Sequence, residues 1–431
     1  MPGFVRLLKE NRNYRYTWMG QVVSEIGDHF NNIAVFSLVV QQDSGGMAVT
    51  GVMLARAVPA ITIGPLAGVL LDRMDRKRLM LVSDLVRGVV AAAFILTLTD
   101  PSHHLIYVLS ALLMAASPFF TAGRSSILPT IATKEQLLTA NSLTQTTQWS
   151  TLTLGAMLGG LSVAGLGYAW AFFLNAMSFL FSAWCISMLR LPKNAQRAGR
   201  KALTENDMMR PWHEYVEGLR YMRSTPLLVG IAVLTVGWAS GGGAAQILFS
   251  LFGEKVFHRG ASGIGTIWAF AGVGLLMGGA LAHRIFPGLS FSAYKRVIVF
   301  AYLVHGLSYV VFSQMKDFWL ACGFMLLSRA GVAVSAVSNY AQLFRHVPDQ
   351  YRGRVFATIE SLNWSMMLLS MLGAGIASQH YSPRLIGAVS GVLSSLTAFY
   401  WLYLDGSGRL PEPAVTGIEA GEVEVHEPTV P

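Results

Sequence analysis

Two carboxylates lie in one apolar stretch near the start of the chain. Glu25 and Asp28 fall within residues 17–41, and their spacing puts both side chains on one face of a helix. Inside a membrane, burial favours the neutral form of a carboxylic acid, so a proton taken up on one side can be released on the other. We therefore expect Asp28 first, and Glu25 second, to carry protons or bind substrate. The alternative is a structural role, in which both acids pair with Arg56 or with other donors.

Two arginines in other apolar stretches are candidates for binding an acidic group of a substrate. Arg56 lies within residues 47–71, and Arg329 lies near the centre of residues 317–341. A buried guanidinium needs an anionic or hydrogen-bonding partner. That partner is either a substrate or a carboxylate of the protein, and both interpretations stay open. The expected substrate-binding set also includes two amides and two aromatic residues that suit a flat or amphipathic molecule: Asn31, Asn32, Trp149 and Trp364.

Other ionisable residues in apolar stretches are weaker candidates. His305 and Glu360 are kept as candidates for proton coupling, although a lone histidine among aromatic and aliphatic neighbours is more often a packed polar residue. Asp84 and Arg87 are spaced for a local ion pair on one helix. We expect that pair to support the basic turn that precedes it.

The sequence carries no pattern typical of an enzyme or of a cofactor site. There is no phosphate-binding loop, no set of zinc ligands and no nucleophile elbow. Cys185 and Cys322 both lie inside apolar stretches, so neither is expected to form a disulfide or a metal site. We expect no catalytic activity, no cofactor and no bound metal.

The composition is that of a membrane protein with several spans. Hydrophobic residues make up 53% of the 431 residues and charged residues 13%, and the mean hydropathy is +0.48. The 43 glycines suit close contact between helices in lipid. The net charge of +9 is spread over short loops rather than gathered on one face, so a nucleic-acid partner is not expected.

Apolar stretches long enough to cross a bilayer as helices recur along the chain. They group into an N-terminal half (residues 1–190) and a C-terminal half (226–404), joined by a polar connector (191–225) and followed by an acidic tail (405–431) that we expect to be disordered. The twelve expected helices cover residues 17–41, 47–71, 79–100, 104–128, 139–165, 168–190, 226–252, 261–286, 294–315, 317–341, 355–380 and 383–404.

The lysines and arginines assign a side of the membrane to each loop. Of the 32, 24 lie on one predicted side, with the largest groups before the first stretch, in the turn at residues 72–78 and in the connector. Short loops rich in these residues stay in the cytoplasm, so we expect both termini there. The opposite side has only four such residues: Lys255, Arg259, Lys316 and Arg384. A removable signal peptide is not expected, because the first apolar stretch contains Glu25 and Asp28 and lacks an Ala-x-Ala-like cleavage site.

An internal repeat relates the two halves. Trp149-Ser150 and Gly160 recur 215 positions later as Trp364-Ser365 and Gly375. Two six-helix halves in parallel repeat are typical of transporters that hold the substrate between the halves near the middle of the membrane. The repeat therefore favours a transport protein.

The basic turn carries a resemblance to a known family. Gly68, Asp72, Arg73, Arg76 and Lys77 match the pattern of the loop between helices 2 and 3 of the major facilitator superfamily. Asp75 stands where most members have glycine, a departure shared by a branch that exports macrolides and siderophores. Further stretches are similar to that branch, which contains macrolide efflux proteins and the enterobactin exporter: Ser24–Asp28, Gly64–Gly68, Asp84–Arg87, Leu138–Leu143, Phe172–Ala176 and Arg352–Val355.

The resemblance implies a mechanism and a set of gating residues. It implies alternating access, with export driven by the proton gradient. It further implies that Asp72 closes the cytoplasmic side by facing the N-terminus of a helix in the other half, with Arg354 helping to receive it; the alternative is a turn that only anchors the topology. The implied gating set is Gly68, Asp72, Arg73, Arg76, Asp84, Arg87 and Arg354.

The sequence therefore predicts a monomeric transporter in the cytoplasmic (inner) membrane of a bacterium, surrounded by lipid. We expect proton-coupled efflux of a small organic compound, either a siderophore-like metabolite or an antibiotic. An uptake symporter and a lipid flippase are alternatives on the same fold. A membrane sensor or scaffold that does not transport is the alternative from a different class.

Overall fold

The computed structural model describes residues 2–42, 46–99, 104–190, 216–285 and 289–413. Side chains are not described for residues 2, 42, 64–66, 68–73, 134–135, 138, 145, 349–350 and 353 within those ranges. The predicted disordered tail and most of the connector lie outside the described residues.

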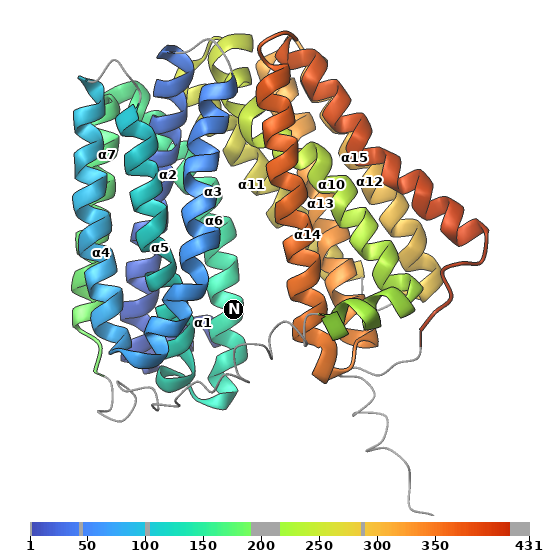
Figure 1. Ribbon diagram of the computed structural model, residues 1–431, viewed down its shortest axis with the longest axis horizontal. Helices are drawn as coiled ribbons and strands as arrows, with labels where there is room; N and C mark the ends of the chain where they lie inside the picture. Colours follow the sequence, from blue (N-terminus) through green and yellow to red (C-terminus); the bar gives the residue numbers. More distant parts are fainter. Residues whose placement is uncertain (1, 43–45, 100–103, 191–215, 286–288, 414–431) are drawn as a thin grey trace, which may run out of the picture. The chain divides into compact units, whose positions relative to one another are not determined.

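The described residues form helices and contain no strand (Figure 1). Residues 216–224 form a short helix just before the second repeat. The other helices are α1 (Pro2–Glu10), α2 (Arg12–Gln42), α3 (Gly46–Arg73), α4 (Arg76–Ala93), the 3-10 turn η1 (Phe94–Leu98), α5 (His104–Ile131), α6 (Lys134–Leu166), α7 (Tyr168–Ser187), α10 (Pro226–Leu251), the π-helical turn η2 (Phe252–Val256), α11 (Gly260–Ile285), α12 (Phe291–Gln314), α13 (Phe318–His346), α14 (Asp349–Ala377) and α15 (Pro383–Gly406).

The predicted all-α membrane fold with twelve long helices is confirmed. Eleven stretches within the described residues are long and apolar enough to span a membrane. α2 is not among them, because its middle carries Glu25, Asp28, Asn31 and Asn32. It nevertheless packs along its length against α6 and α7. A helix this polar is held in the bundle by its neighbours rather than by its own hydropathy.

The first residues of the helices in the two halves are related by the offset of about 215 positions that the sequence predicts. Each long helix from α2 to α7 begins 214 or 215 residues before its counterpart in the series α10 to α15. Equivalent pairs also pack together, since α4 packs on α5 and α7 while α12 packs on α13 and α15. The charges do not repeat: positions 215 residues after Asp28 and Arg87 hold Gly243 and Tyr302.

Local sequence sets the helix ends. Asp75 caps α4, because its side chain accepts a hydrogen bond of 3.2 Å from the backbone N–H of Arg78. This gives a physical reason for an aspartate at a position where the family pattern has glycine. Ser290, Asp317 and Ser382 cap α12, α13 and α15 in the same way. Gly167, with φ of 88°, lets the chain turn between α6 and α7.

The chain divides into two compact units by its packing. The first contains Met1–Lys201 and Phe249–Gly272, and the second contains Ala202–Leu248 and Val273–Pro431. Residues 249–272, which belong to the second repeat in sequence, thus pack with the first unit. The predicted division at residues 190 and 226 stays a prediction.

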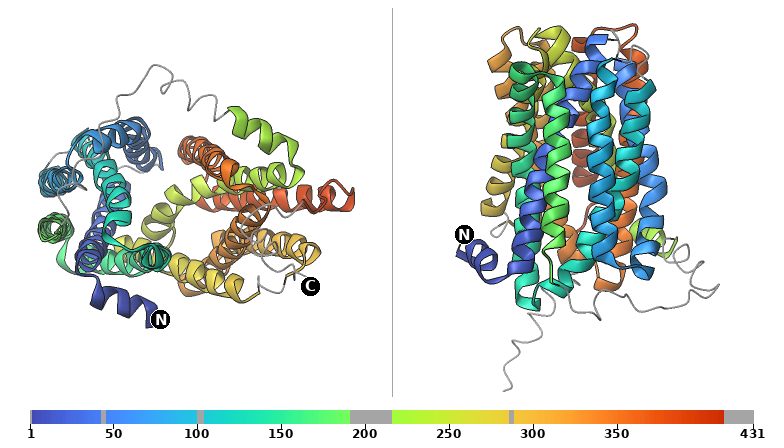
Figure 2. Two further views of the ribbon diagram at one scale, coloured as in Figure 1. Left: turned by 90° about the horizontal axis from the view of Figure 1, so that it is seen from below. Right: turned by 90° about the vertical axis from the view of Figure 1, so that its left-hand side faces the viewer.

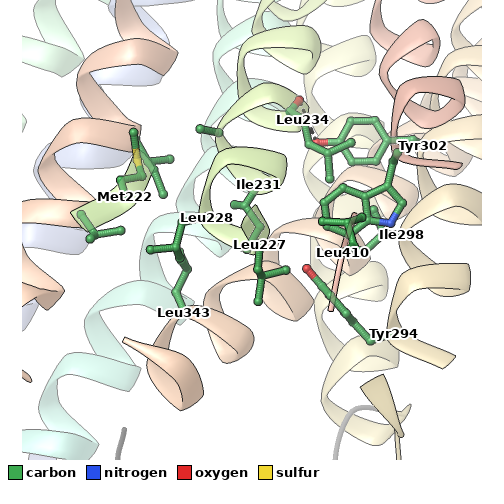
Figure 3. Close-up of a cluster of buried hydrophobic side chains, with 14 of the residues drawn as sticks. Met222, Leu227, Leu228, Ile231, Leu234, Tyr294, Ile298, Tyr302, Leu343 and Leu410 are labelled. Atoms are coloured by element: carbon green, nitrogen blue, oxygen red, sulfur yellow. Dashed lines mark hydrogen bonds between the residues drawn. The ribbon is translucent and has the colours of Figure 1, made fainter. Parts of the chain in front are cut away.

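Each unit has its own apolar core. In the first unit the long helices run side by side, with α1 at one end of them (Figures 1 and 2), and the cluster around Tyr14 and Met80 is fully buried. In the second unit a larger cluster surrounds Trp401, which is fully buried. Figure 3 shows part of that cluster, including the Tyr302 hydroxyl, which donates a hydrogen bond of 3.1 Å to the Leu234 carbonyl.

Candidate functional site

Glu25 lies at the centre of a hydrogen-bonded network in the first unit. Its Oε1 accepts a hydrogen bond of 2.8 Å from Gln21 Nε2, one turn earlier on α2. Its Oε2 accepts a hydrogen bond of 2.7 Å from Thr151 Oγ1 of α6. The guanidinium of Arg124, on α5, lies 3.6 Å from Oε1. Three helices therefore hold this carboxylate in place.

Asp28 has no such support. One turn after Glu25 on α2, its carboxylate makes no hydrogen bond or ion pair within the described part of the chain. It nevertheless interacts electrostatically with charged groups on three helices. These are Arg87, Glu25, Arg56 and Asp84.

Close helix contacts fix α2 at the level of Asp28. A methyl group added at Gly27 would lie 2.1 Å from Ser178 Oγ of α7, and one added at Gly155 of α6 would lie 2.8 Å from the ring of His29. Both distances are shorter than any carbon contact, so no larger residue fits without movement. The residues on either side of Asp28, Gly27 and His29, are thus in close contact with α7 and α6.

Arg56 is a buried cation with unused hydrogen-bonding capacity. Its Nη1 donates a hydrogen bond of 2.5 Å to Asn32 Oδ1, and its guanidinium lies over the Phe36 ring, 5.2 Å from the ring centre. Its Nε and Nη2 are buried without a hydrogen-bond partner in the described structure, and so are both polar atoms of Asn31. The direct pairing of Arg56 with Glu25 or Asp28, considered as the alternative structural role, is not among the described contacts.

Asp84 and Arg87 form the predicted local ion pair on α4. Both side chains are almost fully buried, and Ser182 Oγ of α7 donates a hydrogen bond of 2.7 Å to Asp84 Oδ2. The Arg87 guanidinium lies 4.4 Å from the ring centres of both Phe120 and Phe179. This arrangement stabilises the packing of α4 on α5 and α7.

The basic turn also binds neighbouring helices. Arg76 Nη1 donates to the Ser126 carbonyl at 2.9 Å, and Lys77 Nζ donates to the carbonyls of Ser187 and Leu189, both at 2.7 Å. These bonds connect the start of α4 to the ends of α5 and α7. The side chains of three predicted gating residues, Gly68, Asp72 and Arg73, lie outside the described residues.

The second unit contains a separate buried polar group. His305 Nδ1 of α12 shares a hydrogen bond of 2.8 Å with Ser328 Oγ of α13. Its Nε2 and the Tyr309 hydroxyl are buried without a partner in the described residues. Arg329, next to Ser328, is 8% exposed and interacts electrostatically with both His305 and Tyr309.

The remaining predicted residues lie in exposed or end positions. Glu360 Oε1 accepts a hydrogen bond of 3.0 Å from the Tyr340 hydroxyl, and Arg354 forms an ion pair of 2.5 Å with Glu217 on the helix of residues 216–224. Trp149 and Trp364 are 39% and 53% exposed. Their roles in gating and substrate binding stay predictions.

Sequence reasoning did not identify Arg124 and Thr151 as partners of Glu25. Arg124 was visible as an arginine inside an apolar stretch, but no pattern along the chain indicates that α5 approaches α2 at this level. Thr151 carries no signal at all, because threonine is common in such helices. No group of three potential metal ligands occurs in the described residues.

Comparisons with known proteins identify the family to which the chain is similar. A model of the Major Facilitator Superfamily matches residues 17–293. An uncharacterised MFS-type transporter of Bacillus subtilis is 27% identical over 391 residues, covering 86% of this chain and 88% of that protein. The enterobactin exporter of Salmonella typhi is 27% identical over 365 residues, covering 81% of each. These relatives are transporters and not enzymes.

Solved structures show the same fold. A bacterial homologue of the human lysosomal transporter Spinster, in an inward-facing and unoccupied conformation, matches with a TM-score of 0.68 at 12% identity, over 91% of this chain and 97% of that one. An inward-facing bacterial homologue of the iron transporter ferroportin matches with a TM-score of 0.67 at 16% identity, over 90% and 98%.

Proposed function

The chain belongs to the Major Facilitator Superfamily, and we propose that it is a proton-coupled exporter of a small organic compound. The protein is a multi-pass membrane transporter. Its direction, its coupling ion and its substrate are the proposed part. The relative named as an enterobactin exporter supports export of a siderophore-like metabolite, with an antibiotic as the other candidate substrate.

The observation that carries the proposal is the difference between two neighbouring acids. Glu25 is held by Gln21, Thr151 and Arg124, whereas Asp28 has no hydrogen-bond partner among the described residues. A carboxylate that exchanges protons must be able to change its charge without breaking a network that holds helices together. Asp28 meets this condition and Glu25 does not, so we assign the proton to Asp28 and a structural role to Glu25.

Substrate and proton compete for the Asp28 carboxylate, and this competition couples proton entry to substrate export. In the ionised form, the carboxylate accepts a hydrogen bond from a hydroxyl or amine of the substrate that enters from the cytoplasm. After the transporter opens outward, a proton from outside neutralises Asp28 and the substrate loses this bond. The protein then returns inward and releases the proton into the cytoplasm. Each cycle exchanges at least one proton for one substrate molecule.

Arg56 indicates the chemistry of the substrate's other end. Two of its guanidinium nitrogens are buried without a partner in the described structure, at a helix level close to Asp28. Such donors favour an acidic or otherwise acceptor-rich group. The preferred substrate therefore carries hydroxyl or amine donors for Asp28 and an acidic or chelating group for Arg56. Asn31 and Asn32, on the same stretch of α2, are assigned to the same site.

The second unit is assigned a supporting role. Arg329, with His305 and Tyr309 around it, is a second buried cation that suits an acidic group of the substrate. Glu360 is bound to Tyr340 and is the weaker candidate for proton coupling. Asp72, Arg354 and the basic turn are assigned to closure of the cytoplasmic side. The monomer lies in the inner membrane, surrounded by lipid, with both termini in the cytoplasm.

Transport into inside-out vesicles tests the function. The probes are enterobactin and a macrolide antibiotic, because the two represent the candidate substrate classes. We expect one of them to accumulate when the vesicle interior is acidic and to leak out when an ionophore collapses the pH difference. Accumulation that ignores the pH difference contradicts proton coupling, and accumulation only with an alkaline interior contradicts export.

A further inference from the structure

A basic and aromatic cluster lies at one end of the first unit, where α2 begins and α7 ends. The Arg12 guanidinium lies over the Tyr16 ring, 5.5 Å from the ring centre. The Tyr16 ring meets the Trp184 ring edge-on, with 6.0 Å between the two ring centres. Arg190 follows the end of α7 and is exposed. We call Arg12, Tyr16, Trp184 and Arg190 the α2–α7 cluster.

Hydrogen bonds hold the two arginines of the cluster close together. Asn13, the neighbour of Arg12, donates a hydrogen bond of 2.9 Å from Nδ2 to the Arg190 carbonyl. The Arg190 N–H in turn donates one of 3.0 Å to Asn13 Oδ1. Lys77 Nζ of α4 fixes the end of α7 from another side, through the Ser187 and Leu189 carbonyls. Both long cationic side chains therefore start from one fixed junction.

The cluster has a net positive charge. Neither Arg12 nor Arg190 forms an ion pair with a carboxylate in the described part of the chain. Glu10, the acid next to Arg12 in sequence, pairs with Arg6 at 2.8 Å. Lys9 is exposed one turn before Arg12 and adds a further positive charge. The charge of the cluster thus suits an anion.

An apolar stripe runs along α7 away from the cluster. Phe173, Met177, Leu180 and Trp184 are spaced by four, three and four residues, so they share one helix face. All four are between 40% and 47% exposed. They lie within the membrane-spanning stretch Tyr168–Ser187, and Arg190 lies just beyond it. The surface is therefore apolar inside the membrane and cationic where the membrane ends.

This polarity matches one class of ligand. A phospholipid has apolar chains inside the membrane and a phosphate at its surface, and tyrosine and tryptophan prefer the level of the headgroups. Guanidinium groups bind phosphate through charge-assisted hydrogen bonds. A soluble protein or nucleotide would meet the arginines but not the stripe, because the stripe lies at the depth of the lipid chains.

We propose that the α2–α7 cluster binds the headgroup of an anionic phospholipid. Arg12 and Arg190 contact the phosphate, Tyr16 and Trp184 lie beside the headgroup, and the acyl chains follow the stripe on α7. The charge distribution assigns this end of the helices to the cytoplasm, so the lipid belongs to the inner leaflet. The bound lipid joins the start of α2 to the end of α7. This site goes beyond the proposed function, because it needs neither substrate nor protons.

Native mass spectrometry of the full-length protein in a neutral detergent tests the proposal. The probes are phosphatidylglycerol and phosphatidylcholine with the same acyl chains, added at equal concentration. Both contain a phosphate, but the choline group is positively charged and is repelled by the arginines. We expect the parent to retain phosphatidylglycerol over phosphatidylcholine by at least about tenfold.

Four variants locate the site. Arg12→Gln and Arg190→Gln should each lower this preference about fivefold, whereas Arg12→Lys keeps the charge and should retain most of it. Arg220→Gln is the matched control, because it removes an exposed positive charge from the second unit on the same predicted side, and it should keep the parent's preference. Thermal unfolding of each variant shows that the protein is folded.

Trp184→Ala tests the apolar part of the site. It removes contact with the acyl chains and leaves both arginines in place. We expect it to weaken the binding of both lipids and to leave their ratio unchanged. Unchanged retention of both lipids by this variant contradicts the placement of the lipid along α7.

Three further results overturn the proposal. The first is a parent that shows no preference between the two lipids, and the second is an equal preference in Arg12→Gln, Arg190→Gln and the parent. The third is full displacement of phosphatidylglycerol by an equal concentration of glycerol 3-phosphate, which would show a site for soluble anions. Dimers in place of lipid-bound monomers would assign this face to a second copy of the chain and contradict the proposal as well.

Discussion

Glu25 and Asp28 lie one helical turn apart on α2, yet within the described residues only Glu25 is hydrogen-bonded. The two acids have the same sequence signal, since both interrupt an apolar stretch. Their surroundings separate them, because Arg124 and Thr151 contact the Glu25 carboxylate, whereas no described group forms a hydrogen bond or ion pair with Asp28. The pair therefore divides into one acid that is bound to three helices and one acid that we propose exchanges the proton.

The first prediction concerns the stability provided by Arg124. Arg124→Gln should lower the apparent melting temperature in detergent, because it leaves the Glu25 carboxylate largely buried with two neutral donors, at a cost of ~1–3 kcal/mol. Changing both Arg124 and Glu25 to glutamine should restore part of the loss. If the loss of melting temperature in the double variant equals the sum of the losses in the two single variants, Arg124 and Glu25 do not act as a unit.

The second prediction concerns Asp84 and Arg87. Arg87→Met leaves a fully buried carboxylate with Ser182 as its hydrogen-bond donor, and we expect a destabilisation of ~3–5 kcal/mol. Adding Asp84→Asn should recover much of it. Unfolding is measured in detergent for the parent, for both single variants and for the double variant. The four free energies of unfolding give the coupling energy between Asp84 and Arg87. A coupling near zero contradicts the assignment of this pair to helix packing.

Much of the fold follows from hydropathy. Stretches of about 20 apolar residues must form helices in a membrane, and the structure places the long helices where the sequence predicts them. Helix ends were less exact: α6 begins at Lys134 rather than at residue 139, and α14 at Asp349 rather than at residue 355. Both helices extend beyond the apolar stretch into polar residues, where hydropathy gives no signal.

The candidate site was only partly predictable. Asp28, Arg56 and the Asp84–Arg87 pair are visible because charge is rare in apolar helices. The partners of Glu25 depend on how α2, α5 and α6 approach one another, which no local pattern encodes.

The third prediction uses the contact between α6 and α11. Gly265→Ala should destabilise the protein by ~1–3 kcal/mol, because the new methyl group would meet the backbone of Ala156 and Gly160. Gly165→Ala on α6 is the matched control, since nothing lies within 4 Å of its added carbon, and it should be neutral or slightly stabilising. Equal effects of the two changes on thermal unfolding would contradict the packing described for this contact.

The fourth prediction is the orientation in the membrane. In a background without Cys185 and Cys322, a cysteine at Arg220 should react with a membrane-impermeant maleimide only after the cells are opened, because the connector is assigned to the cytoplasm. A cysteine at Lys316 should react in intact cells. Both positions are exposed, so reversed labelling would show that the charge distribution had been interpreted with the wrong sign.

The central claim is that Asp28 carries the coupling proton, and the most direct measurement is pH-driven transport in sealed vesicles by three proteins. The parent should accumulate the transported probe against its gradient. Asp28→Asn should lose at least about 90% of this accumulation while keeping passive exchange, because an amide preserves the shape and cannot release a proton. Glu25→Gln, the matched control on the same helix face, should retain pH-driven transport with reduced stability. Full pH-driven accumulation by Asp28→Asn, or loss of it by Glu25→Gln alone in folded protein, would contradict the assignment.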